Sequence, residues 1–331
     1  MIIRGLSLGY ITVVTIALTT AALPIPDNNR GNSFLMIALP LIPIFIAVHV
    51  VKLLINRHPQ PTQRMIVDLK THWPKLIGAG AIYVSMAMSL EVFSGIKKSI
   101  PFVVPFYLDP PLIKLDRALF FGTDPWRITH GLFGWATQPI AWLYDTWHML
   151  HIGVAVWIAL AMDEAQKIRF AIVMQFIWLF LGGGLAMLLS SVGPIMVGDF
   201  YSDPSFDPML ATLTEQVPRV IAIKNTLIKT MDDPLLISGI SAMPSIHVAI
   251  AVASALWLQR FKIKALSVVG WVYALAIYIG SIHLGWHYAT DGLVSGPLVV
   301  LVWWLAGRYV RWLEHREFSI GKGQTTAAAN T

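Results

Sequence analysis

Residues 265–307 read ALSVVGWVYALAIYIGSIHLGWHYATDGLVSGPLVVLVWWLAG. Two apolar runs flank a short polar turn, and each is long enough for a helix to cross the ~30 Å of hydrocarbon in a bilayer. The whole chain of 331 residues is 56% hydrophobic and 13% charged, with a mean hydropathy of +0.65. Because soluble domains carry roughly 25% charged residues, this composition excludes an ordinary water-soluble globule. It predicts a multi-span membrane protein.

Eight apolar stretches of the chain predict membrane helices, so the expected fold is an all-α integral membrane bundle of about eight spans. The absence of Cys excludes disulfides, thiol catalysis and Cys-ligated zinc sites. The predicted spans are residues 5–24, 33–51, 76–95, 139–162, 169–192, 246–260, 265–284 and 287–307.

The spans divide the chain into four parts. Residues 1–100 hold the N-terminal membrane helices, and residues 101–138 mix proline, aromatic and charged residues in a way that predicts short interfacial helices. Residues 139–310 form the expected catalytic membrane core, with a proline-broken outer loop at 193–245. The tail, residues 311–331, becomes small and polar near its end, where we expect disorder.

Basic residues are divided unevenly between the two sides that these spans define. The side that holds both termini has 15 Lys and Arg residues, and the other side has nine. The positive-inside rule therefore predicts cytoplasmic termini. Segments 101–138 and 193–245 would then be extracytoplasmic.

Two clusters of ionisable residues lie at the predicted outer ends of the last three spans. In the first, Pro244 precedes an apolar run and is expected at a first helical position. The free N–H groups of that turn, with Ser245, would form an anion site beside His247. The alternative is a capped helix start that merely carries an interfacial histidine.

The second cluster contains His287 and Asp291, which are four residues apart and share a helix face. The carboxylate can accept a proton from one ring nitrogen and raise the basicity of the other. A buried structural pair is one alternative. A metal site made of His283, His287 and Asp291 is another, although the spacing lacks the Glu of an H-E-x-x-H helix.

The predicted spans run out and back, so they bring His247 and His287 to the same side of the membrane. Two histidines, one carboxylate and a helix N-terminus suit phosphoryl chemistry, as nucleophile, general acid, orienting group and anion cradle. We expect the two rings to face each other across a space about one phosphate wide.

These residues resemble motifs of the type 2 phosphatidic acid phosphatase superfamily, whose second and third motifs read P-S-G-H and S-R-x5-H-x3-D. Pro244-Ser245-Ile246-His247 matches the second with Ile in place of Gly, and His287-x3-Asp291 matches the end of the third. Ile246, Ala242-Met243 and Tyr288 look more like the inositol phosphorylceramide synthase branch, which transfers a headgroup between lipids. The resemblance covers residues 139–307.

The resemblance implies a six-helix phosphatase-like core and a role for each matching residue. His287 would become a phosphohistidine, Asp291 would orient it, His247 would protonate the leaving oxygen, and Ser245 would help to hold the phosphate. It also implies an enzyme that needs no metal or other cofactor. Its partners would be a lipid phosphoester donor and an alcohol or lipid acceptor; no nucleic acid is expected, and the oligomeric state stays open.

Two departures from the family pattern remove expected cations. Ser281 stands where the third motif has Arg, and the K-x6-R-P first motif is absent, its place taken by residues 190–194. Other groups must then bind the phosphoryl charge, and Lys224 and Arg127 are the leading candidates. The remaining residues expected to line the substrate site are Ser281, His283, Asp145 and His148.

The sequence thus predicts a lipid phosphotransferase with an extracytoplasmic site. A lipid phosphate phosphatase, which uses water as acceptor, is the first alternative. A non-catalytic lipid-binding or transport subunit is the second.

Overall fold

The computed structural model describes residues 5–22, 50–51, 53–57, 59–159, 163–231 and 239–328, and within these ranges every regular element is a helix. The elements are α1 Gly5–Ala21, α4 Pro61–Val103, α5 Asp109–Leu119, α6 Pro125–Phe133, η1 Gly134–Ala136, α7 Thr137–Ala159, α8 Glu164–Gln175, η2 Phe176–Leu185, α9 Ala186–Leu188, η3 Pro194–Met196, α10 Val197–Tyr201, η4 Pro204–Phe206, α11 Asp207–Gln216, α12 Pro218–Lys229, α13 Ile246–Gln259, α14 Lys264–His283 and α15 Ala289–Ala328.

Four helical stretches in the described part of the chain are long and apolar enough to cross a membrane: Ile77–Val103, Glu164–Leu188, Lys264–His283 and Ala289–Arg316. Helices α1 and α13 are apolar but shorter. The chain is therefore an all-helical protein with the character of a multi-pass membrane protein. Most of the predicted span 33–51 lies outside the described residues.

Two helices extend well beyond the spans predicted for them. Helix α4 is continuous over 43 residues, although only 76–95 was expected to cross the membrane. Helix α15 continues to Ala328, into the tail that was expected to be disordered. Hydropathy identifies the apolar part of a helix that can lie in the membrane, but the backbone hydrogen bonds of the helix can continue beyond that part. The sequence therefore did not predict where α4 begins or where α15 ends.

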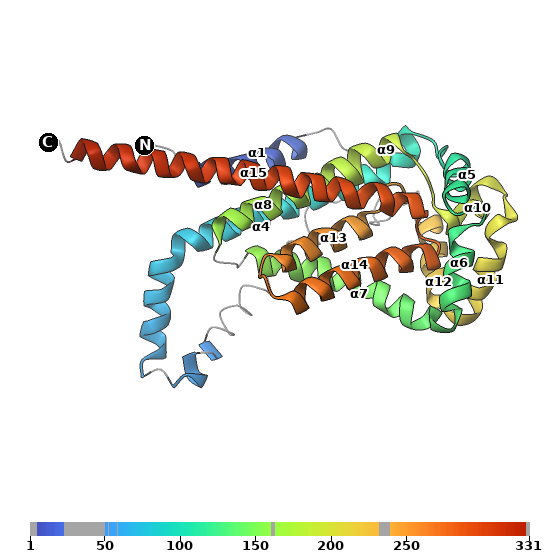
Figure 1. Ribbon diagram of the computed structural model, residues 1–331, viewed down its shortest axis with the longest axis horizontal. Helices are drawn as coiled ribbons and strands as arrows, with labels where there is room; N and C mark the ends of the chain where they lie inside the picture. The colour runs from blue at the N-terminus through green and yellow to red at the C-terminus, as the bar shows by residue number, and fades with distance from the viewer. Residues whose placement is uncertain are drawn as a thin grey trace.

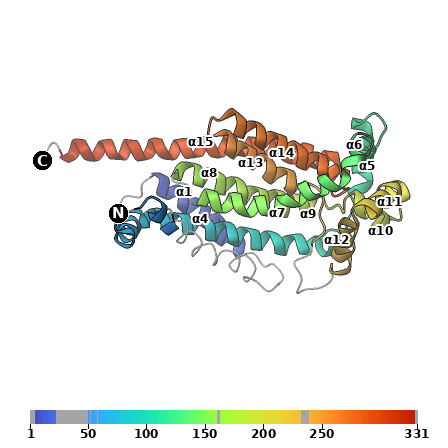
Figure 2. The same cartoon turned by 90° about the horizontal axis from the view of Figure 1, so that it is seen from below.

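The long helices run along the long axis of the molecule, except for the first part of α4, which turns across it (Figure 1), and the short helices gather at one end. Helices α5, α6, α10, α11 and α12 lie together at the end opposite to the far end of α15 (Figures 1 and 2). Helix α14 ends there, and α15 begins there (Figure 1). The two ionisable clusters therefore lie at the same end of the molecule as the described residues of 101–138 and 193–245, the two segments predicted to be extracytoplasmic.

Polar side chains join the long helices inside the bundle. Gln175 of α8 donates from Nε2 to the carbonyl oxygen of Val13 (2.9 Å) and to Ser89 Oγ (3.3 Å), which links α8 to α1 and α4. Arg169 donates to the carbonyl oxygen of Trp303 in α15. Such contacts between helices are a recurring source of cohesion inside membranes, where hydrophobic burial contributes little between helices.

Small residues let the backbone approach closely at the site end of the bundle. A Cβ atom on Gly182 would lie 2.4 Å from Phe93 Cε2 of α4 and 3.1 Å from Ile246 Cδ1 of α13. Gly193 has φ 88°, and a Cβ there would lie 2.7 Å from the Trp286 carbonyl oxygen. The loop after α9 is thus pressed against the turn that leads into α15.

Candidate active site

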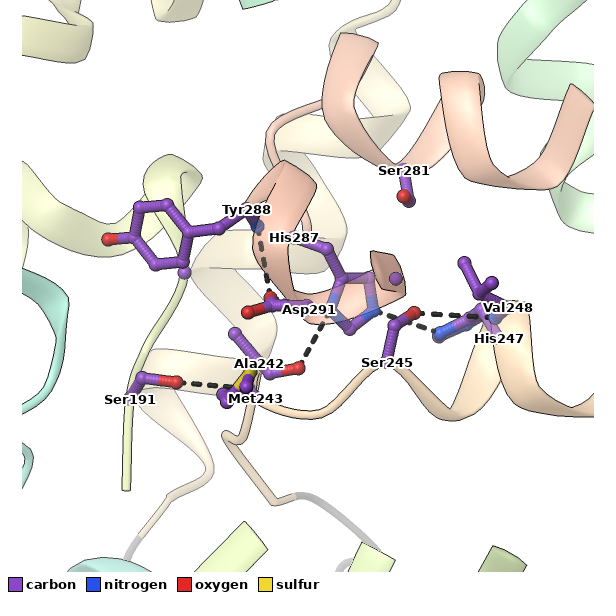
Figure 3. Close-up of polar contacts among 12 residues, drawn as sticks. Ser191, Ala242, Met243, Ser245, His247, Val248, Ser281, His287, Tyr288 and Asp291 are labelled. Carbon is purple, nitrogen blue, oxygen red and sulfur yellow. Dashed lines mark hydrogen bonds and ion pairs between the residues drawn. The ribbon is translucent and has the colours of Figure 1, made fainter. Parts of the chain in front are cut away.

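His287 lies directly before α15, and its ring is held by two acceptors. Its Nδ1 atom is 2.8 Å from the Ala242 carbonyl oxygen and 3.2 Å from Asp291 Oδ2 (Figure 3). A carbonyl oxygen can only accept, so we assign the ring proton to Nδ1. The Nε2 atom of the neutral ring then carries the lone pair that a nucleophile needs.

The His287 Nε2 atom faces the second histidine, His247, in the first turn of α13. The distance from His287 Nε2 to His247 Nδ1 is 3.3 Å, and the ring centroids are 5.4 Å apart. The rings share a direct hydrogen bond, donated by His247, instead of facing across a phosphate-wide gap. The two helix starts are joined closely, since the Ser245 N–H group donates to the Asp291 carbonyl oxygen at 3.4 Å.

Helix α7 supplies an aromatic wall around His247. The Tyr144 ring stacks on the His247 ring with centroids 4.9 Å apart, and the Trp147 ring lies at 4.1 Å. Trp147 also donates its indole N–H to the His247 carbonyl oxygen at 3.1 Å. The His148 ring is the next nearest, with centroids 6.4 Å apart, so this predicted residue does lie beside the histidine pair.

Ser245 is buried and caps α13. Its Oγ atom accepts the Val248 N–H group at 3.3 Å, and its ψ of 110° places it outside the helix. The helix therefore begins at Ile246, and the expectation that Pro244 occupies a first helical position is wrong by two residues. The reason is that the serine side chain satisfies a free N–H group of the first turn and so becomes the N-cap.

The loop before α13 contains Ala242, whose carbonyl bonds to His287. Ser191, at the position of the absent first motif, fixes this loop. Ser191 accepts the Ala242 N–H group with its carbonyl oxygen and the Met243 N–H group with Oγ, both at 3.0 Å. These bonds position the Ala242 carbonyl oxygen, which accepts the hydrogen bond from His287 Nδ1 (Figure 3). Ser191 therefore acts on the site through the backbone.

Two buried aspartates of α5, which sequence reasoning missed, fix the turn around His287 from the other side. Asp109 accepts four hydrogen bonds, from the N–H groups of Val192 and Gly193 and from the hydroxyl groups of Tyr201 and Tyr288. Burial and the charge of Asp109 raise the pKa of Tyr201, so its hydroxyl stays protonated and keeps donating.

Asp116 binds the start of α15. Its carboxylate accepts the Ala289 N–H group at 2.7 Å, the Thr290 N–H group at 3.0 Å and the Thr290 hydroxyl at 2.5 Å. Burial raises the pKa of Asp116, and these three bonds oppose the rise. The signal in the sequence was the spacing of the buried face of α5, which runs through Asp109, Leu112, Ile113 and Asp116.

Two residues predicted to line the site direct their side chains elsewhere. The Ser281 hydroxyl donates to the Tyr278 carbonyl oxygen at 2.7 Å, and only its own carbonyl touches His287, by accepting the backbone N–H group at 3.2 Å. His283 is buried, with Nε2 2.9 Å from Thr137 Oγ1. Neither side chain reaches the His287 ring.

The predicted phosphate-binding cations are already paired with carboxylates. Lys224 of α12 lies 2.6 Å from Asp199 of α10. Arg127 lies 3.5 Å from Asp124, and its guanidinium stacks on the Trp126 ring. Asp145, predicted at the substrate site, forms an ion pair with Arg219. The structure therefore brings neither predicted cation to the histidine pair as a free charge.

A small pocket lies beside His287, on the side of α5 and α6. It contains about 250 Å³ of empty space, open solvent included. The Trp126 indole N–H group, buried in this wall, has no hydrogen-bond partner in the described chain. In the same ranges, no three His, Cys, Asp or Glu side chains are arranged to hold a metal ion. The pocket is lined by Ile113, Asp116, Asp124, Pro125, Trp126, Pro194, Phe206, Ile282, His287 and Tyr288.

We expect Asp109→Asn to lower the free energy of unfolding by roughly 2–3 kcal/mol, because an amide NH2 group would face N–H and O–H donors that need an acceptor. Thermal unfolding in detergent measures this effect. Glu215→Gln, on the exposed face of α11, is the matched control. An unfolding midpoint for Asp109→Asn equal to that of the control would contradict the role given to Asp109.

Comparison with known proteins gives one match. A family model described as the PAP2 superfamily matches residues 110–305, which is more than half of the chain. Comparisons with curated proteins and with solved structures return no significant match. The matched range contains α5 from its second residue onward, the histidine pair and the first part of α15.

Proposed function

Because the chain belongs to the PAP2 superfamily, we propose that it is a membrane phosphotransferase that moves a phosphoryl-alcohol headgroup from one lipid to another. Members of this superfamily are phosphatases or phosphotransferases, and membership suggests phosphoester transfer or hydrolysis on lipids. One observation carries the proposal: the His287 Nδ1 atom lies between two acceptors, and its Nε2 atom points at His247.

In the first step the His287 Nε2 atom attacks the phosphorus of the donor lipid. A P–N bond forms, the P–O bond to the leaving group breaks, and protonated His247 gives its proton to the leaving oxygen. Asp291 stabilises the positive charge that develops on the His287 ring. The product is a phosphohistidine on His287.

In the second step the acceptor alcohol attacks the same phosphorus. His247, now neutral, takes the proton of the hydroxyl; the new P–O bond forms and the P–N bond breaks, which restores His287. The His287 Nε2 atom must come within about 3 Å of the phosphorus, and the His247 nitrogen must lie about 3 Å from the oxygen to which it gives its proton. The two ring nitrogens must therefore separate to roughly 6 Å. The observed 3.3 Å contact must therefore open when the substrate binds.

Two features favour transfer to a lipid alcohol over hydrolysis. Ile246 departs from the second phosphatase motif in the direction of the inositol phosphorylceramide synthase branch, and Ser281 stands where the third motif has Arg. The His247 ring is also covered by Tyr144 and Trp147, which give the acceptor side an apolar surface. A phosphatase remains the second candidate, since the same two histidines could activate water.

We further propose that the site faces the extracytoplasmic side and that both termini are cytoplasmic. The basic turn Arg260–Lys264 supports this orientation, because it lies between α13 and α14 at the end away from the histidines. The short helices around the site carry more balanced charge.

The chain offers a direct test of this orientation, because it contains no Cys. Phe121, between α5 and α6, is 100% exposed, and Ile263, in the basic turn, is 53% exposed. We expect a membrane-impermeant maleimide to label Phe121→Cys in intact cells and Ile263→Cys only after permeabilisation. The reverse labelling pattern would invert the orientation.

We expect His287→Ala to reduce headgroup transfer by more than about 1000-fold, because the covalent route is lost. Asp291→Asn should reduce it by roughly 100-fold, since the ring keeps its position but loses the charge that stabilises the imidazolium. Transfer is measured with a fluorescent lipid phosphoester in proteoliposomes, and unfolding midpoints show that the variants fold. Full activity of His287→Ala would exclude the proposed nucleophile.

The identity of the acceptor separates the candidate functions. With a donor labelled in its headgroup and a lipid alcohol present, we expect a new labelled lipid, formed equally well in the presence of a metal chelator. Release of only a soluble phosphoalcohol or inorganic phosphate would identify a phosphatase. Lipid binding with neither product would support the non-catalytic alternative, and activity lost in chelator and restored by one divalent ion would contradict a metal-independent reaction.

A further inference from the structure

The histidine pair and Asp291 contain no permanent cation, yet the transferred phosphoryl group is negatively charged throughout the reaction. Catalysis of phosphoryl transfer depends largely on neutralising that charge. Lys224 and Arg127, the predicted cations, are bound to Asp199 and Asp124 instead. The site therefore needs a cation from elsewhere in the fold.

Lys97 belongs to the part of α4 that packs near the start of α13, which carries His247. Its positive charge acts electrostatically on the His247 and His148 rings, which agrees with the packing described next. Phe93, one helical turn earlier, packs on Gly182, which also contacts Ile246 at the start of α13. The face of α4 that carries Phe93 and Lys97 thus points toward the first turn that holds His247.

The backbone before Ser245 is shaped around this lysine. A Cβ atom on Gly239 would lie 2.8 Å from Lys97 Cγ and 3.0 Å from the Lys97 carbonyl oxygen. Only a glycine leaves room here for the lysine stem. From Gly239 the chain runs directly to Ala242, Ser245 and His247. Lys97 is therefore packed against the loop whose Ala242 carbonyl accepts the hydrogen bond from His287, the proposed nucleophile.

Lys97 differs in its surroundings from Lys224 and Arg127, the two cations predicted to bind phosphate. Its side chain is partly exposed, and no hydrogen bond or ion pair joins it to another of the described residues. Lys224, in contrast, is buried against a carboxylate. A lysine ammonium has three donors and a compact charge, which suits a phosphoryl oxygen.

We propose that Lys97 binds the phosphoryl group of the donor lipid and supplies the positive charge that the missing motif residues would otherwise supply. This inference rests on the proposed function, because it assumes that phosphorus is attacked at His287. Lys97 would touch the phosphoryl oxygens, stabilise them as the P–O bond breaks, and remain bound through the phosphohistidine.

The test compares Lys97→Met, which keeps the length of the stem, with Lys97→Arg, which keeps the charge. We expect kcat/KM for the donor lipid to fall by roughly 100-fold in Lys97→Met and by less than about 10-fold in Lys97→Arg. Inhibition by inorganic phosphate should weaken by at least roughly 10-fold in Lys97→Met, which a merely structural role would not require. Lys114→Met, an exposed lysine of α5, is the control.

A second variant keeps the inference testable if Lys97→Met does not fold. Gly239→Ala should displace the lysine stem without removing its charge and lower kcat/KM by roughly fivefold or more. Gly131→Ala, where an added Cβ meets nothing within 4 Å, is its control. Suppose that Lys97→Met and Gly239→Ala both keep activity within about twofold of the unchanged protein and that His287→Ala is inactive. This result would overturn the role of Lys97 and leave the proposed function intact. Activity of His287→Ala would overturn both.

Discussion

The site depends on the placement of one imidazole nitrogen between two hydrogen-bond acceptors. Because the Ala242 carbonyl and the Asp291 carboxylate both face His287 Nδ1, the proton is fixed there and Nε2 carries the lone pair, which accepts from His247 until substrate separates the two rings. The surrounding contacts preserve this placement. Ser191 holds the Ala242 loop, and Asp109 and Asp116 hold the turn from Tyr288 to Thr290.

Carboxylates buried at the end of a membrane bundle are costly unless donors surround them. Asp109 and Asp116 meet this condition with four and three hydrogen bonds from segments distant in sequence. The polar network therefore fastens α5, the loop after α9 and the start of α15 together. This network holds the first turn of α13, which carries His247, and the turn before α15, which carries His287, so that both histidines can reach one phosphorus.

The sequence was sufficient for the all-helical membrane class, for four of the eight predicted spans and for the meeting of His247 with His287, because hydropathy and motif spacing encode them. It was not sufficient for contacts made over long range. Asp109 and Asp116 were missed because their partners lie more than 80 residues away. Lys224 was favoured although its partner, Asp199, lies 25 residues earlier and is not visible in a local charge pattern. Arg127 was favoured although Asp124, three residues earlier, could have been recognised as its partner. The count of eight spans, the six-helix core and the synthase-like branch stay predictions.

The central claim is that His287 Nε2 forms a covalent bond to phosphorus, and mapping the intermediate tests it most directly. The protein would be mixed with a donor labelled in its phosphoryl group, quenched under basic conditions and analysed by peptide mass spectrometry. The account predicts an acid-labile phosphoryl group on the peptide that contains His287, attached through Nε2, because Nδ1 is occupied by Ala242 and Asp291. A label on another residue, or on His287 Nδ1, would contradict it.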